Sequence, residues 1–333
     1  MPQPSTNQVH VNRPLTDISV AYLQDPANFA YSRCAPMLPV EKDTDIYALY
    51  TKDYWLRDDV QITEPGGEDP VSGYGIDFTN TYRCDIYRLA KDITVEERAN
   101  SDSPLQPDTD ATLYLSGQFA RKQEIVLASV IMQTGVWNGA SYDITGVAAN
   151  PGNNQVYQWS DYTNSTPVED IRNQKAVILQ NTGFEPNKLI LGYQTFNKLI
   201  DHPELIDRVK YTGGIVDQVK TLKNLADLFQ LEDVIVSKGV KNAAAEGVAF
   251  NGQFIFGKTA LLCYVPKTPG KRIPSAFYGF YWKGVSGGMG TTVAMRRFVI
   301  PHRDNVTRIA GKMAFTWKII GSDLGMFFDS IVA

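Results

Sequence analysis

One octapeptide has residue types and a spacing that could bind a nucleotide. Residues 252–259 match G-x-x-x-x-G-K-[ST], in which a coiled loop presents backbone N–H groups to phosphates and its lysine adds positive charge. That chemistry needs a helix to begin at the Lys-Thr pair, because the helix N-terminus holds the anion. Here the intervening Gln-Phe-Ile-Phe favours extended backbone, and a short apolar run then ends at Pro266. We predict strands around this turn and keep a P-loop NTPase using Gly257, Lys258 and Thr259 as the alternative from a different functional class.

The other titratable side chains form no constellation that would catalyse a reaction or bind a metal. Glu96 and Glu97 lack the partners needed for acid–base catalysis, and we expect them on a solvated face. His202 stands before a proline, where we expect a structural role at the end of a helix. The histidines and cysteines are widely separated and never at metal-ligand spacing: His10, His202, His302, Cys34, Cys84 and Cys263. The sequence therefore predicts no enzyme, no catalytic residue, no cofactor and no metal.

Composition excludes several further classes. The 333 residues carry a net charge of −4, whereas a protein that grips nucleic acid through its phosphates usually has a basic surplus. No apolar run approaches the length of a membrane span, and the polar first 14 residues do not resemble a secretory signal. The odd number of cysteines, 3, favours reduced thiols. We expect no contact with a membrane.

The first third of the chain reads as an arm followed by a hairpin. Residues 1–41 are rich in proline, asparagine and other polar residues, which is typical of an extended arm. Strand-like segments at 45–62 and 82–89 flank a tip at 64–73 that is rich in proline and glycine, which predicts a long hairpin. A two-stranded hairpin is marginally stable alone in water. We therefore expect this one to lean on another surface, such as a neighbouring subunit.

The rest of the sequence predicts an α+β protein. Residues 108–137 have acidic and hydroxyl side chains at the start and then an increasingly apolar pattern, which predicts one long buried helix. Thr166-Pro167-Val168-Glu169 matches a capping box at the start of a second helix, and Gly183 supplies its stop. Short strands and helices alternate between residues 188 and 237, and strands dominate after Gly247.

The order of these elements resembles the major capsid proteins of tailed bacteriophages, which have the Hong Kong 97-like fold. Four local stretches strengthen the resemblance, which extends from about residue 45 to 330. They are residues 49–58, residues 159–161 with 166–171, residues 182–192, and residues 199–203 with Tyr211.

The resemblance implies a division of the chain. Residues 1–41 would form an N-terminal arm, 42–82 the E-loop hairpin, and 83–164 the P-domain with its spine helix at about 108–137. Residues 165–305 would form the A-domain, and 306–333 would return to the P-domain. Contacts between subunits are expected from the E-loop side chains Tyr54, Trp55, Arg57, Val71 and Tyr74.

The resemblance also implies a function and its partners. The chain would self-assemble as pentamers and hexamers into an icosahedral head that encloses double-stranded DNA without sequence-specific binding. A portal protein and, given the short arm, a separate scaffolding protein would be partners, with a decoration protein as a further candidate. Assembly would occur in the host cytoplasm, and the product would be the virion capsid. The alternative within the same fold is an encapsulin-like compartment.

Overall fold

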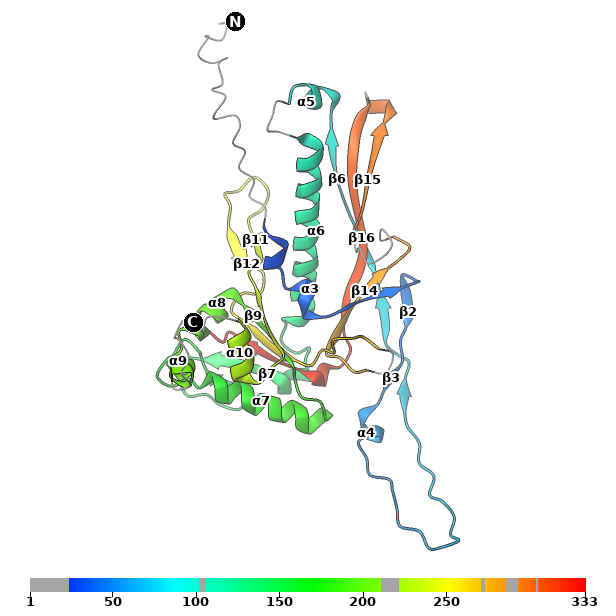
Figure 1. Ribbon diagram of the computed structural model, residues 1–333, viewed down its shortest axis with the longest axis vertical. Helices are drawn as coiled ribbons and strands as arrows, with labels where there is room; N and C mark the ends of the chain where they lie inside the picture. Colours follow the sequence, from blue (N-terminus) through cyan, green and yellow to red (C-terminus); the bar gives the residue numbers. More distant parts are fainter. Residues whose placement is uncertain (1–23, 102–105, 211–221, 271–272, 286–292, 304) are drawn as a thin grey trace, which may run out of the picture.

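The computed structural model describes residues 24–101, 106–210, 222–270, 273–285, 293–303 and 305–333. Residues 1–23 of the expected arm lie outside these ranges, and so does Tyr211. The molecule is elongated, with a tall helix-and-sheet body at one end and a loop that extends beyond the rest at the other (Figure 1). None of the described helices has the length and apolarity needed to cross a membrane.

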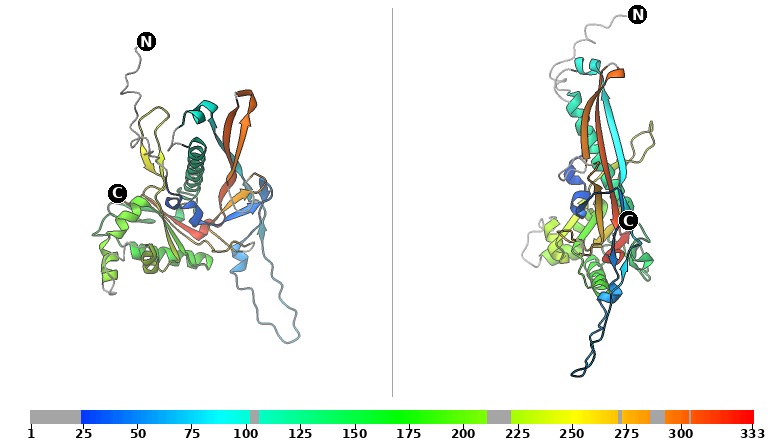
Figure 2. Two further views of the ribbon diagram at one scale, coloured as in Figure 1. Left: turned by 45° about the horizontal axis from the view of Figure 1, so that its top comes forward. Right: turned by 90° about the vertical axis from the view of Figure 1, so that its right-hand side faces the viewer.

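The tall body consists of α6 (Pro107–Ile131) packed on one face of a five-stranded sheet (Figures 1 and 2). The central strand is β16 (Val306–Ile319), which pairs with β6 (Asp85–Ile93) on one edge. Its other edge pairs with β15 (Val293–Ile300) and then with β14 (Phe277–Trp282), beside which β1 (Met37–Val40) lies in parallel.

The packing between α6 and β16 is close at Gly311. A Cβ added there would overlap the ring of Phe119, which projects from α6. We therefore expect Gly311→Ala to destabilise the fold by about 2 kcal/mol, because an extra carbon in a packed core forces its neighbours off their preferred rotamers. Ala310→Ser, on the opposite face of β16, should change the free energy of unfolding by less than about 0.5 kcal/mol. Urea unfolding of both variants checks this, and equal effects would contradict it.

The long helix is shorter than the predicted 108–137. It ends at Ile131, whose carbonyl accepts a hydrogen bond of 2.8 Å from the buried indole N–H of Trp137. The chain reverses between these residues through Gly135, which has a φ of +80°. Because Trp137 enters the core on the other side of this turn, burial of the indole ends the helix.

A second sheet of six strands lies beside the lower end of α6, with helices α7 to α10 grouped around it (Figure 1). Its strand order is β10-β9-β13-β17-β7-β8. The strands are β7 (Asp143–Val147), β8 (Gln155–Tyr157), β9 (Lys188–Gly192), β10 (Asp233–Ser237), β13 (Ala260–Cys263) and β17 (Gly325–Asp329). The helices are α7 (Pro167–Thr182), α8 (Tyr193–Ile200), α9 (Pro203–Lys210) and α10 (Leu222–Phe229).

Helix α7 begins and ends where the sequence predicts, but its capping differs. Gly183 follows its last residue with a φ of +75°, which is the expected stop. Thr166 occupies the N-cap position without a side-chain hydrogen bond. Instead, the N–H of Val168 donates to the carboxylate of Glu204 at 3.2 Å. The capping acceptor thus comes from α9 and not from within the predicted capping box.

The two arms of the hairpin pair as β-strands only at its base. β2 (Thr44–Ile46) pairs with β5 (Thr81–Arg83), and β3 (Leu49–Tyr50) pairs with β4 (Ile76–Asp77). Residues 54–56, predicted as strand, instead enter the helical turn α4 (Lys52–Trp55), which the N–H of Leu56 closes on Lys52. This turn brings Trp55 against the rings of Tyr50 and Tyr74, a contact that an alternating strand would not allow.

The sheets do not follow the division of the chain at residue 305. β14 and β15, which that division gives to the A-domain, pair with β16 in the tall body. β17, which it gives to the return, lies in the second sheet between β13 and β7. A strand of 14 residues such as β16 offers two long edges, and distant segments satisfy their backbone hydrogen bonds there.

The remaining elements are short. They include the helices α3 (Tyr31–Cys34) and α5 (Val95–Ala99) and the pair β11 (Val240–Asn242) and β12 (Gly252–Phe254). Single 3₁₀ turns occur at Pro26–Asn28, Gly139–Tyr142, Pro301–Arg303 and Ser322–Leu324.

Candidate assembly surface

Exposed large apolar side chains concentrate on the hairpin. Ten of them lie between residues 46 and 78: Ile46, Tyr54, Trp55, Leu56, Val60, Ile62, Val71, Tyr74, Ile76 and Phe78. Soluble monomers rarely expose so many apolar groups on one segment, and such segments mark surfaces that another molecule covers. The hairpin is therefore the strongest candidate for a functional surface in the described chain.

The neck of the hairpin is held by an aromatic cluster. The ring centroids of Tyr50, Trp55 and Tyr74 lie 5.8 to 5.9 Å from one another. Beside them, Thr51 donates hydrogen bonds from its N–H and its hydroxyl to the carbonyl of Gly75, at 3.2 and 3.1 Å. A Cβ on Gly75 would lie 2.7 Å from the Thr51 hydroxyl, so only glycine allows this approach. Two of the predicted contact residues, Trp55 and Tyr74, thus meet across the two arms.

The base of the hairpin is anchored to the body. The ring of Tyr82 stacks on Phe280 at 4.8 Å with an interplanar angle of 15°. Lys52 forms an ion pair of 2.6 Å with Asp323, which lies just before β17. The N–H of Cys84 donates to the carbonyl of Asp43 at 2.8 Å. These contacts fix the direction of the hairpin while the distal part extends past the molecule (Figure 2).

The remaining predicted contact residues are not part of the aromatic cluster, although the ring of Tyr54 lies beside Gly75 in the neck. Arg57 pairs with Asp59 at 2.9 Å, Tyr54 is half exposed, and the side chain of Val71 is 98% exposed. Sequence reasoning missed Val60 and Ile62, which are 90% and 104% exposed. Because they alternate with polar neighbours, they were interpreted as part of a strand. Two exposed apolar residues beside the tip also indicate a surface that another molecule covers.

The P-loop pattern does not form a phosphate-binding loop. Thr259 is followed directly by β13, so no helix N-terminus is available for an anion. The Thr259 hydroxyl donates to the carbonyl of Phe256 at 2.7 Å, within a turn in which Gly257 has a φ of +59°. The predicted strands on either side of this turn are confirmed, and the geometry does not support a nucleotide site.

Ser165 and His202 lie close together but are arranged for structure. The ring Nδ1 of His202 accepts the N–H of Glu204 at 3.2 Å, so the ring proton is on Nε2. Nε2 then donates to the Ser165 hydroxyl at 2.9 Å, and that hydroxyl donates to the carbonyl of Asp161. A base that activates a serine must accept its proton at this nitrogen. Burial also lowers the pKa of His202, which keeps the ring neutral.

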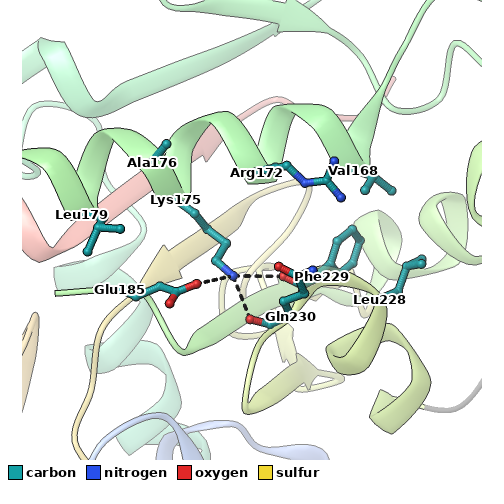
Figure 3. Close-up of a pocket in the computed structure, with 9 residues that line it drawn as sticks. All are labelled: Val168, Arg172, Lys175, Ala176, Leu179, Glu185, Leu228, Phe229 and Gln230. Carbon is teal, nitrogen blue, oxygen red and sulfur yellow. Dashed lines mark hydrogen bonds and ion pairs between the residues drawn. The ribbon is translucent and has the colours of Figure 1, made fainter.

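A cavity of about 180 Å³ lies between α7 and α10 and contains one buried cation (Figure 3). The ammonium of Lys175 has three N–H donors and three acceptors: the carbonyls of Phe229 and Gln230, at 3.2 and 2.7 Å, and the Glu185 carboxylate at 2.9 Å. No donor remains for a ligand, so Lys175 ties α7 to the end of α10. Among the described residues, no group of three or more His, Cys, Asp or Glu side chains could hold a metal.

Asp170 gives this region a pH dependence. Burial raises the pKa of its carboxyl to about 6, although the indole N–H of Trp159 donates to it at 3.0 Å. Between pH 4 and 6 the folded chain therefore holds a proton that the unfolded chain has lost. Stability from this group is fully present below pH 4 and falls as pH rises to 6.

We expect Asp170→Asn to remove this loss, because the amide oxygen still accepts from Trp159. The wild-type free energy of unfolding should fall, relative to the variant, by on the order of 2 kcal/mol between pH 4 and 6. Urea unfolding across that range checks this. Asp69→Asn, at the exposed hairpin tip, should keep the wild-type slope. An unchanged slope in Asp170→Asn would contradict the assignment.

The comparisons with known proteins identify the architecture. No family model matches the chain. A major capsid protein of Burkholderia phage BcepMu is 32% identical over 103 residues, a match that covers 31% of this chain and 31% of that protein. A phage-related protein from Bordetella bronchiseptica has a TM-score of 0.67 at 18% identity, covering 92% of this chain and 93% of that one. The capsid protein of cyanophage P-SCSP1u has a TM-score of 0.61 at 10% identity, covering 93% and 90%.

The chain has the Hong Kong 97-like capsid fold. Within this capsid fold, the hairpin corresponds to the E-loop, α6 to the spine helix of the P-domain, and the second sheet with α7–α10 to the A-domain. An encapsulin from Synechococcus elongatus shares the fold more distantly, with a TM-score of 0.52 at 11% identity over 96% of this chain and 94% of that one. The expected α+β class and fold are confirmed.

Proposed function

We propose that this chain is the major capsid protein of a tailed bacteriophage and assembles into the closed head shell. The observation that carries the proposal is the E-loop, whose apolar side chains remain exposed in the described subunit, on a chain with a capsid fold. A neighbouring subunit would cover Tyr54, Trp55, Val71 and Tyr74, with Arg57 at the rim. Each such contact is weak, and repetition around a closed shell makes the assembly stable.

The arrangement we propose is icosahedral, with copies grouped as pentamers and hexamers through the A-domain. The shell would enclose double-stranded DNA without reading its sequence, in keeping with the net charge of −4. A portal protein, a separate scaffolding protein and a decoration protein are the partners that such a head would use. Assembly would take place in the host cytoplasm.

An encapsulin-like compartment is the alternative within the same fold. It receives less support, because the curated match is a phage capsid protein and the encapsulin is the more distant of the structures compared. The two differ in what the shell contains. Nucleic acid inside particles made in infected cells supports the phage head, and a folded protein cargo supports the compartment.

Negative-stain electron microscopy tests the proposal. The chain is expressed alone and together with the neighbouring genes of its source, purified, and imaged. We expect polyhedral shells or rings of five and six copies. A uniform monomer or small oligomer in every condition would overturn the proposal.

A further inference from the structure

The two ends of the cavity between α7 and α10 differ in their charge. At one end, two backbone carbonyls and the carboxylate of Glu185 satisfy the ammonium of Lys175. At the other end, Arg172 projects from α7 toward Val168 and away from Glu185 (Figure 3). The cavity is therefore lined by one cation that the subunit neutralises and by a second cation at its opening.

Arg172 has no anionic partner in the described part of the chain. No ion pair or side-chain hydrogen bond joins it to another described residue, whereas Lys175, one turn further along α7, pairs with Glu185 at 2.9 Å. Arg172 is exposed and lines the cavity. A guanidinium presents its N–H donors in a planar fork that matches the two oxygens of a carboxylate. The opening of the cavity thus offers a site for one carboxylate.

The walls of the cavity are mostly apolar. Five of its nine lining residues are apolar: Val168, Ala176, Leu179, Leu228 and Phe229. Val168 and Phe229 are buried in the subunit, whereas Ala176 is exposed and Leu179 is 45% exposed. An apolar group that enters the cavity is removed from water on several sides, which is favourable in proportion to the area covered. The cavity therefore favours an apolar group beside the carboxylate.

The size of the cavity decides what kind of ligand it can take. Its volume is about 180 Å³, and an engineered apolar cavity of about 150 Å³ holds one benzene molecule. Sites for whole small molecules and cofactors are usually about 300–1,000 Å³. The cavity thus accommodates a single side chain of the size of leucine or phenylalanine. The rest of the ligand would lie outside, on the exposed Ala176 and Leu179, which fits a segment of a protein.

The charges fix the orientation of this ligand. The carboxylate of Glu185 occupies the Lys175 end and repels a second carboxylate, so the carboxylate of the ligand must lie at Arg172. A cavity this small requires the carboxylate and the apolar side chain to be close together. Neighbouring residues of an extended segment point in opposite directions. The last residue of a polypeptide, in contrast, carries its side chain and its carboxylate on one Cα atom.

We propose that the cavity between α7 and α10 binds the carboxy-terminal residue of a partner protein. A side chain of the size of leucine or phenylalanine would fill the cavity, and the terminal carboxylate would accept hydrogen bonds from Arg172. The inference goes beyond the proposed function, because it concerns a site that is complete within a single subunit. Binding should weaken as salt concentration rises, because Arg172 is exposed and its charge is screened.

Binding of a short peptide to the full-length chain tests the proposal. The probe is a peptide of sequence GSGSAF with fluorescein at its N-terminus and a free carboxylate at its C-terminus, and binding is followed by fluorescence anisotropy. We expect saturable binding. Amidation of the terminal carboxylate should weaken binding by about tenfold, because the bond to the guanidinium loses its charge. Replacement of the terminal phenylalanine by serine should weaken it by about tenfold, because the cavity is left unfilled.

Variants of the chain locate the bound peptide. Arg172→Gln should weaken binding of the free carboxylate by about tenfold and should bind the free and the amidated peptide equally well. Ala176→Phe, which fills the opening of the cavity, should abolish binding. Both positions are exposed, so we expect unchanged unfolding temperatures. Lys223→Gln is the matched control, because this exposed lysine of α10 does not line the cavity and its replacement removes the same charge.

Several results would overturn the proposal. They are no binding of the free peptide to the wild type, equal binding of the free and amidated peptides to it, and unchanged binding in Arg172→Gln. A wild type that binds no peptide, together with a loss of shells in Arg172→Gln, would also overturn it and would assign this surface to a contact between copies. If Ala176→Phe does not fold, Arg172→Gln decides alone, because Arg172 loses no partner within the described residues. Shell formation is scored separately, so failure of this site leaves the proposed function standing.

Discussion

Shell assembly will be lost when Val60, Ile62 and Val71 are replaced together by serine, while the subunit folds as before. These side chains are between 90% and 104% exposed, so the folded subunit gains nothing from them. Covering each by a neighbour would contribute about 2 kcal/mol, and every copy in a shell would make the same contact. The expected result is at least a hundredfold fall in shell yield with an unchanged unfolding temperature.

Sedimentation velocity and thermal unfolding of the same preparations measure the two parts of this prediction. Val248→Ser with Phe250→Ser is a matched control, because these residues are 64% and 74% exposed on the loop between β11 and β12. A loss of assembly in the control alone would place the main contact on that loop. A lower unfolding temperature in the E-loop variant would mean that these residues stabilise the subunit itself.

Glu124→Ala will have the largest effect on subunit stability, about 4 kcal/mol. The carboxylate is fully buried on the spine helix and accepts three hydrogen bonds from two other parts of the chain. The N–H groups of Ala30 and Tyr31, at the start of α3, donate to it at 3.0 and 2.8 Å, and the Ser237 hydroxyl at the end of β10 donates at 2.6 Å. Removing the acceptor leaves three buried donors unsatisfied, at about 1–3 kcal/mol each before the site relaxes.

Urea unfolding of the unassembled subunit, followed by tryptophan fluorescence, checks this value. Glu124→Gln should cost less than alanine, because one side-chain oxygen remains as an acceptor. Ser237→Ala, which removes only one of the three donors, should cost about 1 kcal/mol. Alanine at position 124 with a free energy of unfolding within about 1 kcal/mol of the wild type would show that the three-way junction is not a principal stabilising contact.

Glu124 also shows where sequence reasoning stops. In the sequence it stands in the apolar half of a predicted helix, and nothing local indicates what its carboxylate binds. Its three partners lie 93, 94 and 113 positions away. The same holds for Arg88 and Lys312, which become neighbours only through the register of β6 and β16. Long-range pairing is decided by the whole fold and leaves no local signal.

Elements with strong local signals could be predicted from the sequence alone. Helix α8 and strand β10 are among the short elements predicted between residues 188 and 237, and α7 ends at the predicted glycine, because periodicity and stop residues act over a few positions. The order of the elements was sufficient to indicate the capsid fold. The sequence likewise indicated that the apolar residues of the E-loop belong to a hairpin that has no core of its own.

Tertiary structure decided the features that depend on distant contacts. Burial of Trp137 ended the long helix early, Glu204 of α9 replaced the predicted cap of α7, and an aromatic cluster turned residues predicted as strand into the helical turn α4. It also placed β14 and β15 beside β16 and moved β17 into the second sheet. In each case, a buried contact between residues far apart in sequence outweighed the local preference, because burying a ring or satisfying a backbone donor is worth more than one residue's propensity.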